Sequence, residues 1–277
     1  MDLGEPRPTL RLTTLTTSRA GRTDGRMTTY TVALPKGGVG KSTTAAELAR
    51  ELGRRGRRVL AIDLDQQGNF TTRLGVGRET EVEYVAADVL RGDAAPEDAA
   101  VPSAYAGVDV LAGTHDLIDV EQAPPADLVT SLRDYLPRMG KWDDVVVDTP
   151  PSVGGLTEAG LAAADVVVVP VESAVEAYDQ IHRLERVIEG RLGRRVRPGL
   201  QIDWLVPTMH DSRRLLDREV VEQLEKRYPG KVTAPVSEAV AVKDAYTAKM
   251  PVTEYAPTSK VAADYAAVTR TILGGAS

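Results

Sequence analysis

The chain has 277 residues, 42% of them hydrophobic and 27% charged, which fits one large α/β domain or two small ones. With no cysteine, it cannot form disulfides, iron–sulfur clusters or thiolate zinc sites. Three histidines argue against a histidine-rich metal centre, and a net charge of −6 argues against a protein that coats nucleic acid over its whole surface.

The N-terminal segment, residues 1–26, is rich in threonine and arginine and has no hydrophobic periodicity, so we expect a disordered tail. It lacks the apolar core of a signal peptide, and no apolar run approaches the roughly 20 residues of a membrane span. We therefore expect a cytoplasmic protein with no membrane partner. Met27 directly precedes the first predicted strand, so the tail is interpreted either as upstream of the true start or as a basic arm that touches nucleic acid.

The first predicted elements are a strand at residues 31–34, a glycine-rich loop at 36–43 and a helix at 44–55. The loop reads Lys-Gly-Gly-Val-Gly-Lys-Ser-Thr, and its glycines let backbone N–H groups come close to an anion. Lys41 opens the helix, whose N-terminal dipole favours negative charge. The hydroxyl of Ser42 suits Mg²⁺. Strand, loop and helix together predict a nucleotide-binding P-loop.

One feature of this loop is unusual. Pro35 stands where an ordinary P-loop has its first glycine, and Lys36 adds a second lysine to the loop. One lysine is enough to hold the phosphates of a nucleotide. Lys36 therefore needs an explanation beyond the binding of its own nucleotide.

Four later apolar runs have the form of strands that are buried on both faces, because they show no alternation. They cover residues 59–62, 145–147, 166–169 and 202–206. Helical stretches such as 126–136 and 181–188 separate them. This alternation predicts a doubly wound, mostly parallel α/β sheet with helices on both faces.

Acidic residues follow two of these runs: Asp63 and Asp65 the first, Asp148 the second. Ligands of such sheets bind beyond the carboxyl ends of the strands, so we expect the three carboxylates to converge on the P-loop. Asp148 is the candidate ligand of Mg²⁺. Asp65 is placed to orient a water for attack on a γ-phosphate, and Asp63 to hold the loop or join the metal shell. The alternative for each is a helix cap or a tightened turn.

These motifs resemble the ParA/MinD family of deviant Walker ATPases, and more narrowly its small partition ATPases of the ParA type. Residues 36–43 are similar to the deviant Walker A motif, with Lys36 in the place of the signature lysine. Residues 63–69 resemble the motif written DxDPQGN, with Gln66 in place of proline, and residues 145–152 resemble the Walker B segment. Later signatures match at 208–211 and 251–255. We expect residues 27–277 to form a single ATPase domain.

The resemblance implies a cytoplasmic, nucleoid-associated partition ATPase with ATP and Mg²⁺ as cofactors and weak basal activity. Two subunits would sandwich two ATP molecules, with the signature lysine of each reaching the other's nucleotide. The homodimer would bind double-stranded DNA without sequence preference, and a ParB-like adaptor would stimulate hydrolysis. The implied catalytic residues are Lys36, Lys41 and Asp65, and the implied metal residues are Ser42, Asp63 and Asp148. The implied ATP-binding residues are Lys36, Gly37, Gly38, Val39, Gly40, Lys41, Ser42, Thr43, Thr208 and Met209.

The chain departs from this family in the segment 236–242. The family commonly has Ile-Pro-Arg-Asn-x-Arg-Leu there, and this chain has Glu238 and Ala241 in place of the two arginines. Because that segment flanks the adenine site and the DNA-binding face in relatives, another basic patch is needed. The candidates are Lys226, Arg227, Lys231 and Lys243. Two arginine clusters, within residues 54–58 and 191–197, are interpreted as solvated faces.

Other functions remain as alternatives. The main one is an orphan ParA-like ATPase that positions a different cargo through a different adaptor. A metabolic P-loop ligase of the dethiobiotin synthetase type shares the predicted fold but has no need of a second loop lysine. The C-terminal residues 271–277 lack the basic amphipathic helix of a MinD-like membrane protein. Neither the partner and cargo nor a plasmid or chromosomal origin follows from the sequence.

Overall fold

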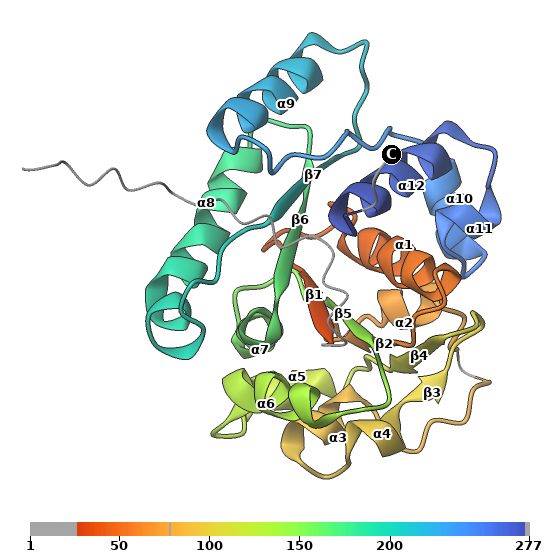
Figure 1. Cartoon of the computed structure of the whole chain (residues 1–277), viewed down its shortest axis with the longest axis vertical. Coiled ribbons are helices and arrows are strands. Elements are labelled where there is room, and N and C mark those ends of the chain that lie inside the picture. Colours follow the sequence, from red (N-terminus) through yellow and green to blue (C-terminus); the bar gives the residue numbers. More distant parts are fainter. Residues whose placement is uncertain (1–26, 78, 275–277) are drawn as a thin grey trace, which may run out of the picture.

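The computed structural model describes residues 27–77 and 79–274, so the expected tail of residues 1–26 lies outside the described part. Its centre is a seven-stranded sheet in the order β3-β4-β2-β5-β1-β6-β7 (Figure 1). The strands are β1 Thr28–Val32, β2 Val59–Asp63, β3 Val101–Pro102, β4 Val108–Leu111, β5 Asp144–Asp148, β6 Val166–Glu172 and β7 Trp204–Thr208. Only the pairing of β3 with β4 is antiparallel among these neighbours. The predicted doubly wound, mostly parallel sheet is confirmed.

Helices cover both faces of the sheet (Figure 1). Those on one face are α1 Lys41–Arg54, α2 Asn69–Arg73, α10 Ala241–Thr247, α11 Val252–Tyr255 and α12 Lys260–Ile272. Those on the other are α3 Ala86–Arg91, α4 Pro96–Ala99, α5 Leu117–Gln122, α6 Leu128–Tyr135, α7 Gly155–Ala163, α8 Ala177–Val187 and α9 Leu215–Arg227. A short 3-10 turn η1 (Leu136–Arg138) follows α6, and a π-type segment η2 (Ile188–Val196) follows α8.

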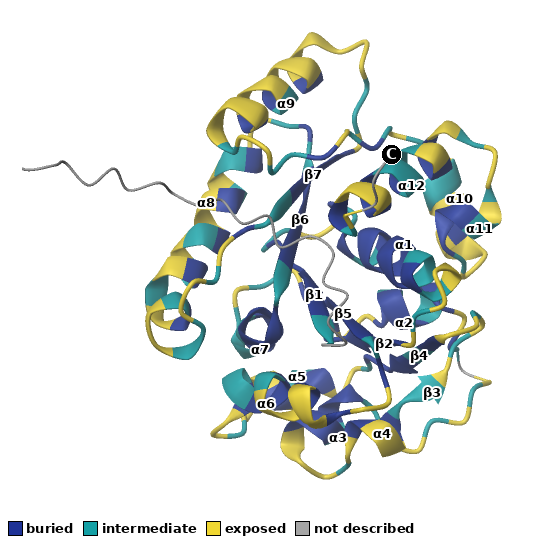
Figure 2. Ribbon diagram, in the orientation of Figure 1, coloured by how far each residue is buried: buried dark blue, intermediate teal, exposed yellow. Residues whose placement is uncertain are grey.

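The strands are apolar on both sides because each side packs against a helical layer. In β2, Val59 and Ala61 join the core beneath α1, whereas Leu60 and Ile62 join the core on the opposite face. Figure 2 shows this double burial as a sheet that is dark along its central strands. None of the helices within 27–77 and 79–274 is long and apolar enough to cross a bilayer.

The predicted boundaries differ from the observed ones mainly at β1, β6 and β7. Strand β6 runs three residues beyond the predicted 166–169, to Glu172. We expected a strand at residues 31–34, but β1 pairs with β5 over Thr28–Val32. Because this strand is rich in threonine, it does not stand out as an apolar run in the sequence. One of these threonines, Thr31, is buried and donates its hydroxyl hydrogen to the carbonyl of Gly160 at 2.8 Å. Strand β7 likewise runs two residues beyond the predicted 202–206, to Thr208.

Helix α1 is fixed to the C-terminal helices by a buried carboxylate. Glu47 is 2% exposed and accepts hydrogen bonds from the backbone N–H groups of Val252 and Thr253 and from the hydroxyl of Thr253. Burial raises the pKa of this carboxyl, and the hydrogen bonds oppose the rise. Hydrogen bonds to a charged group contribute about 1.5–3 kcal/mol each. The start of α11 therefore holds α1, and with it the P-loop, in place.

Candidate nucleotide-binding site

The P-loop joins β1 to α1 in a conformation suited to an anion. Gly38 and Gly40 have φ angles of +79° and +90°, in the left-handed region that other residues rarely adopt. Gly40 is the N-cap of α1 and offers no side chain to the first helical turn. The free N–H groups of that turn, with the positive end of the helix dipole, form a phosphate-binding site.

Lys41 lies inside the loop, where it is only 6% exposed. Its ammonium donates to the backbone carbonyl of Lys36 at 2.6 Å. Burial lowers the pKa of Lys41, and the nearby Asp148 and Asp65 raise it. The first helical residue therefore points its charge back into the concave side of the loop, where the phosphates of a nucleotide would lie.

Asp148 ends β5 and faces Asp63 of β2 in the sheet register, so the predicted convergence of the acids is observed. Both carboxylate oxygens of Asp148 are buried, and from the described residues no hydrogen bond of ordinary geometry reaches either. Burial, and then Asp63, raise the pKa of Asp148 well above its usual value, while the adjacent hydroxyl of Ser42 lowers it. The charge of Lys41 lowers this pKa as well, and a further cation held against the carboxylate would reduce the cost of burying its charge.

A magnesium ion fits this carboxylate. Mg²⁺ prefers oxygen ligands and is usually held by one or two protein groups together with water and substrate phosphates. Asp148 and Ser42 provide such oxygens beside the loop. In the described residues no three His, Asp or Glu side chains gather as a metal site of their own. The site is therefore suited to a cation that arrives with a nucleotide.

Asp63 and Asp65 have different surroundings. One oxygen of Asp63 accepts from the backbone N–H of Asp65 at 3.0 Å, and the other accepts from the N–H and hydroxyl of Thr71 at 2.9 and 2.8 Å. Burial outweighs these bonds and raises its pKa to about 6. With both oxygens engaged, Asp63 holds the loop between β2 and α2. Of the two roles expected of Asp63, these contacts favour the one that holds the loop.

Asp65 is left with one available oxygen. Its Oδ1 accepts from the backbone N–H of Gln67 at 3.0 Å, and no hydrogen bond from the described residues reaches its Oδ2. The side chain lies at the same end of the sheet as Asp148, and its negative charge raises the pKa of Lys41. Its position allows the water-orienting role that we expected of it.

Lys36 is directed away from its own P-loop. Its ammonium pairs with Glu172, the last residue of β6, at 2.7 Å, and the two side chains are 32% and 39% exposed. Only its backbone carbonyl contacts Lys41. The second lysine of the loop therefore lies at the surface, on a carboxylate that sequence analysis did not identify because it is 136 residues away.

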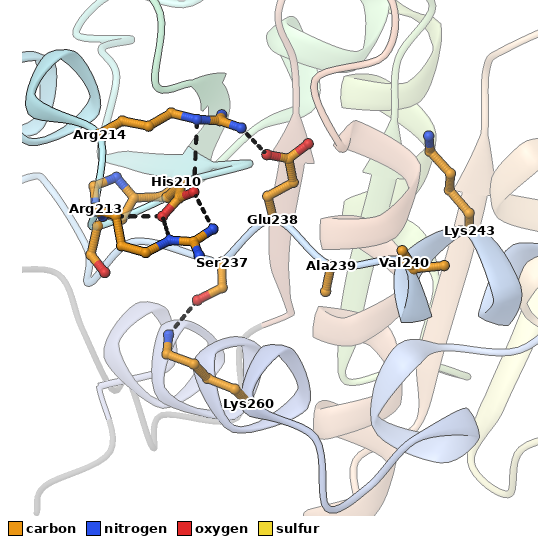
Figure 3. A pocket seen from close by; sticks show the side chains of 11 residues that line it. His210, Arg213, Arg214, Ser237, Glu238, Ala239, Val240, Lys243 and Lys260 are labelled. Carbon is orange, nitrogen blue, oxygen red and sulfur yellow. Dashed lines mark hydrogen bonds and ion pairs between the residues drawn. The ribbon is translucent and has the colours of Figure 1, made fainter.

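Thr208 and Met209 connect the P-loop to a pocket. The hydroxyl of Thr208 donates to the carbonyl of Val39 at 2.9 Å, and Met209 follows with a positive φ of 53°. A pocket of about 410 Å³ begins directly after them (Figure 3). It is lined by His210, Asp211, Ser212, Arg213, Arg214, Ser237, Glu238, Ala239, Val240, Lys243 and Lys260.

Three of the four Lys and Arg side chains that line this pocket pair with acids, two of them with acids of the pocket itself (Figure 3). Arg213 and Arg214 both contact Asp211, at 2.7 and 3.7 Å, and Arg214 also reaches Glu238 at 3.1 Å. Lys260 donates to Ser237 and pairs with an aspartate of its own helix. Sequence analysis missed these arginines and Lys260. The only signal was the basic pair at 213–214, directly after the signature at 208–211.

The four residues predicted to form a substitute basic patch do not lie together. Lys226 pairs with Glu222 at 2.6 Å, Arg227 lies over the ring of Tyr228, and Lys231 donates to the carbonyl of Ile202. These three are at the C-terminal end of α9. Lys243 lines the pocket beside the residues that precede the helix. A helix of 13 residues separates the two groups by about 20 Å. The prediction of a single patch is wrong.

Comparisons with known proteins identify the family of this chain. A family profile described as an AAA domain matches residues 27–202. The chromosome partitioning protein ParA of Caulobacter vibrioides is 38% identical over 230 residues, which cover 81% of this chain and 85% of that protein.

Solved structures share the fold. A structure of Cyanothece McdA has a TM-score of 0.78 at 20% identity and covers 88% of this chain and 99% of its own. A Mycobacterium smegmatis structure described as cobyrinic acid a,c-diamide synthase with bound ADP and magnesium has a TM-score of 0.73 at 31% identity, covering 86% of this chain and 91% of its own. The resemblance read from the motifs is confirmed, and the chain belongs to the ParA/MinD family of P-loop ATPases.

Proposed function

We propose that this protein is a partition-type ATPase that dimerises on ATP and Mg²⁺, binds DNA in the dimeric state and is reset by partner-stimulated hydrolysis. The observation that carries this proposal is the orientation of Lys36, which pairs with Glu172 at the surface while Lys41 alone occupies the loop. A loop lysine that its own site does not use is suited to a second nucleotide. The similarity to Caulobacter ParA supports the same function.

Within one subunit the roles follow from the geometry. The N–H groups of the loop and the ammonium of Lys41 would hold the phosphates, with Val39, Ser42 and Thr43 completing the loop. Ser42 and Asp148 would hold Mg²⁺, which neutralises charge during phosphoryl transfer. Asp65 would accept a hydrogen bond from the attacking water through its available oxygen. Thr208 and Met209 would lie beside the rest of the nucleotide.

In the dimer, each Lys36 would leave Glu172 and reach the nucleotide of the other subunit. Gly37 would lie at this contact. A Cβ added there would come within 3.8 Å of Pro151, so the loop itself has room for a side chain. Its lack of one is better explained by a surface that approaches from outside.

A nucleotide-dependent dimer can act as a switch. We infer that the dimer binds double-stranded DNA without sequence preference and that a ParB-like DNA-binding adaptor accelerates hydrolysis. The protein would then cycle between the nucleoid and the cytoplasm, with each ATP turned over releasing subunits from DNA.

The test is ATP turnover by the purified chain alone, with non-specific plasmid DNA, with the protein encoded beside it, and with both. We expect slow turnover alone and a clear rise only when DNA and the adaptor are both present. Fast turnover of the chain alone would contradict the proposal. A chain that hydrolyses ATP slowly and binds DNA, but that responds to a different protein, would be an ATPase that positions another cargo.

A second function has one observation in its favour. The M. smegmatis structure at 31% identity is described as a cobyrinic acid a,c-diamide synthase with bound ADP and magnesium. Such an enzyme has no use for a loop lysine held outside its own site, which is why we rank it lower. Turnover that depends on a corrinoid acid and an amide donor, and that DNA does not change, would establish it.

A further inference from the structure

The two arginine clusters found in the sequence have different environments in the structure. In the first cluster every arginine is paired with an acid. The pairs are Arg54 with Glu254 at 2.8 Å, Arg55 with Glu51 at 3.0 Å, Arg57 with Asp144 at 2.6 Å and Arg58 with Asp143 at 2.7 Å. This cluster anchors α1 and the loop before β2 to neighbouring elements. It has little charge left to offer a partner.

The second cluster is larger than the sequence indicated and is mostly unpaired. It continues from η2 back into α8 and consists of Arg183, Arg186, Arg191, Arg194 and Arg195, all exposed, which we call the α8–η2 basic surface. Within 27–77 and 79–274, no hydrogen bond or ion pair reaches four of them, and Arg194 makes a single bond, to the carbonyl of Glu189. Arg197 is not part of the surface, because it pairs with Asp165 at 2.8 Å.

The packing of α8 and η2 places these arginines on the outside. The apolar side chains of the two segments, Ala177, Ile181, Leu184, Ile188 and Leu192, are buried against β6, β7 and α9. Charged residues are left on the opposite side, which Figure 2 shows as exposed along α8. Burial of one face therefore exposes a row of like charges on the other.

The charge of this surface is not balanced locally. Residues 183–195 hold five arginines and two glutamates, and one of these, Glu185, already pairs with His182 and accepts from Tyr228. The dipole at a helix C-terminus offsets about 0.3–1 kcal/mol per cation, and only within the last turn. In a chain with a net charge of −6, such a concentration of unpaired cations fits an anionic partner.

We propose that the α8–η2 basic surface binds the phosphates of double-stranded DNA; this rests on the proposed function and names the surface that it uses. Duplex DNA carries one charge per about 1.7 Å of its axis, so a surface with five exposed arginines can face several phosphates. The exposed side chains that carry the charge of this surface are arginines, and guanidinium groups bind phosphate oxygens at any base sequence. Such contacts position DNA without specifying its sequence.

Two further observations favour this surface over the pocket of Figure 3. The pocket cations Arg213, Arg214 and Lys260 are already paired with acids. In addition, η2 leads into the amino end of β7, whereas the P-loop lies at the carboxyl ends of the strands. DNA bound at η2 would leave the nucleotide site open.

The test compares two double variants that remove the same charge. Arg191→Gln/Arg195→Gln neutralises the proposed surface, and Arg55→Gln/Arg58→Gln neutralises the paired cluster. Binding of a labelled random duplex is measured with a non-hydrolysable ATP analogue across a salt series. If each arginine neutralises one phosphate, the slope of log affinity against log salt concentration becomes shallower by about 1.8 in the first variant. If the variant and the wild type bind equally at 1 M salt, the variant should then bind roughly 60-fold more weakly at 0.1 M salt. The control should bind like the wild type.

The outcomes separate this inference from the proposed function. Equal losses in both variants would show an effect of net charge alone and overturn the surface. Unchanged binding of the first variant, or a comparable loss in Lys243→Gln/Lys260→Gln, would place DNA elsewhere while leaving the function intact. A wild-type chain that binds no DNA would remove both. Nucleotide affinity and the thermal unfolding midpoint are measured for every variant. Both should be unchanged in Arg191→Gln/Arg195→Gln, whereas the control, which loses two ion pairs, should unfold at a slightly lower temperature.

Discussion

The ion pair between Lys36 and Glu172 should act against dimerisation. In the structure the ammonium and carboxylate are 2.7 Å apart and partly exposed. If Lys36 reaches a second subunit, the pair must break first, once in each subunit. Replacement of Glu172 by Gln removes the competing carboxylate and leaves a side chain of nearly the same size. We therefore predict that Glu172→Gln strengthens the nucleotide-dependent dimer.

The size of the effect follows from the exposure of the pair. An ion pair that is exposed to this degree contributes about 0.2–1 kcal/mol, because solvent screens it. Two pairs break in a symmetric dimer, so the variant should gain about 0.4–2 kcal/mol of association free energy. That corresponds to a dissociation constant about 2-fold to 30-fold lower, at 1.36 kcal/mol per factor of ten. The gain should shrink as salt is raised.

Sedimentation velocity at a series of protein concentrations, with Mg²⁺ and a non-hydrolysable ATP analogue, measures this constant. Glu176→Gln is the matched control, since Glu176 is an exposed carboxylate four residues further along the chain. An unchanged or weaker dimer for Glu172→Gln would refute the reasoning. So would an equal gain in the control, because it would show that only the net charge of the face matters.

The remaining predictions concern the nucleotide site. Lys41→Ala should abolish nucleotide binding, measured with a fluorescent ATP analogue, and intact affinity would mean that the loop has another role. Asp65→Ala should keep ATP binding and a long-lived dimer but lose phosphate release; unchanged turnover would rule out its assigned role. Asp148→Asn should stabilise the chain at pH 8 without nucleotide or Mg²⁺ by about 1–3 kcal/mol in urea unfolding, since it removes a buried unpaired charge. Burial raises the pKa of Asp148, so the folded wild type gains protons and stability as pH falls, and the advantage of the variant should shrink towards pH 5. A variant less stable than wild type at pH 8 would contradict this.

Local patterns in the sequence were sufficient for the nucleotide site and the sheet. The run of glycines and lysines at 36–43 specifies an anion-binding loop because backbone conformation and helix polarity are local properties. The convergence of Asp63 and Asp148 followed from a general rule, since parallel strands bring their carboxyl ends to one edge. A resemblance to a family supplied the rest of the predicted chemistry.

What each charge does was decided only by the tertiary structure. The sequence shows Lys36 but not Glu172, which β6 brings beside it because β1 and β6 are neighbours in the sheet. It shows two similar arginine clusters, of which strand order gives one its acids, such as Asp144, and leaves the other without them. The sequence alone determined which groups carry charge. The partners of Lys36 and Arg57 lie far along the chain and depend on how the strands are ordered, because electrostatic pairing acts through space over a few ångströms.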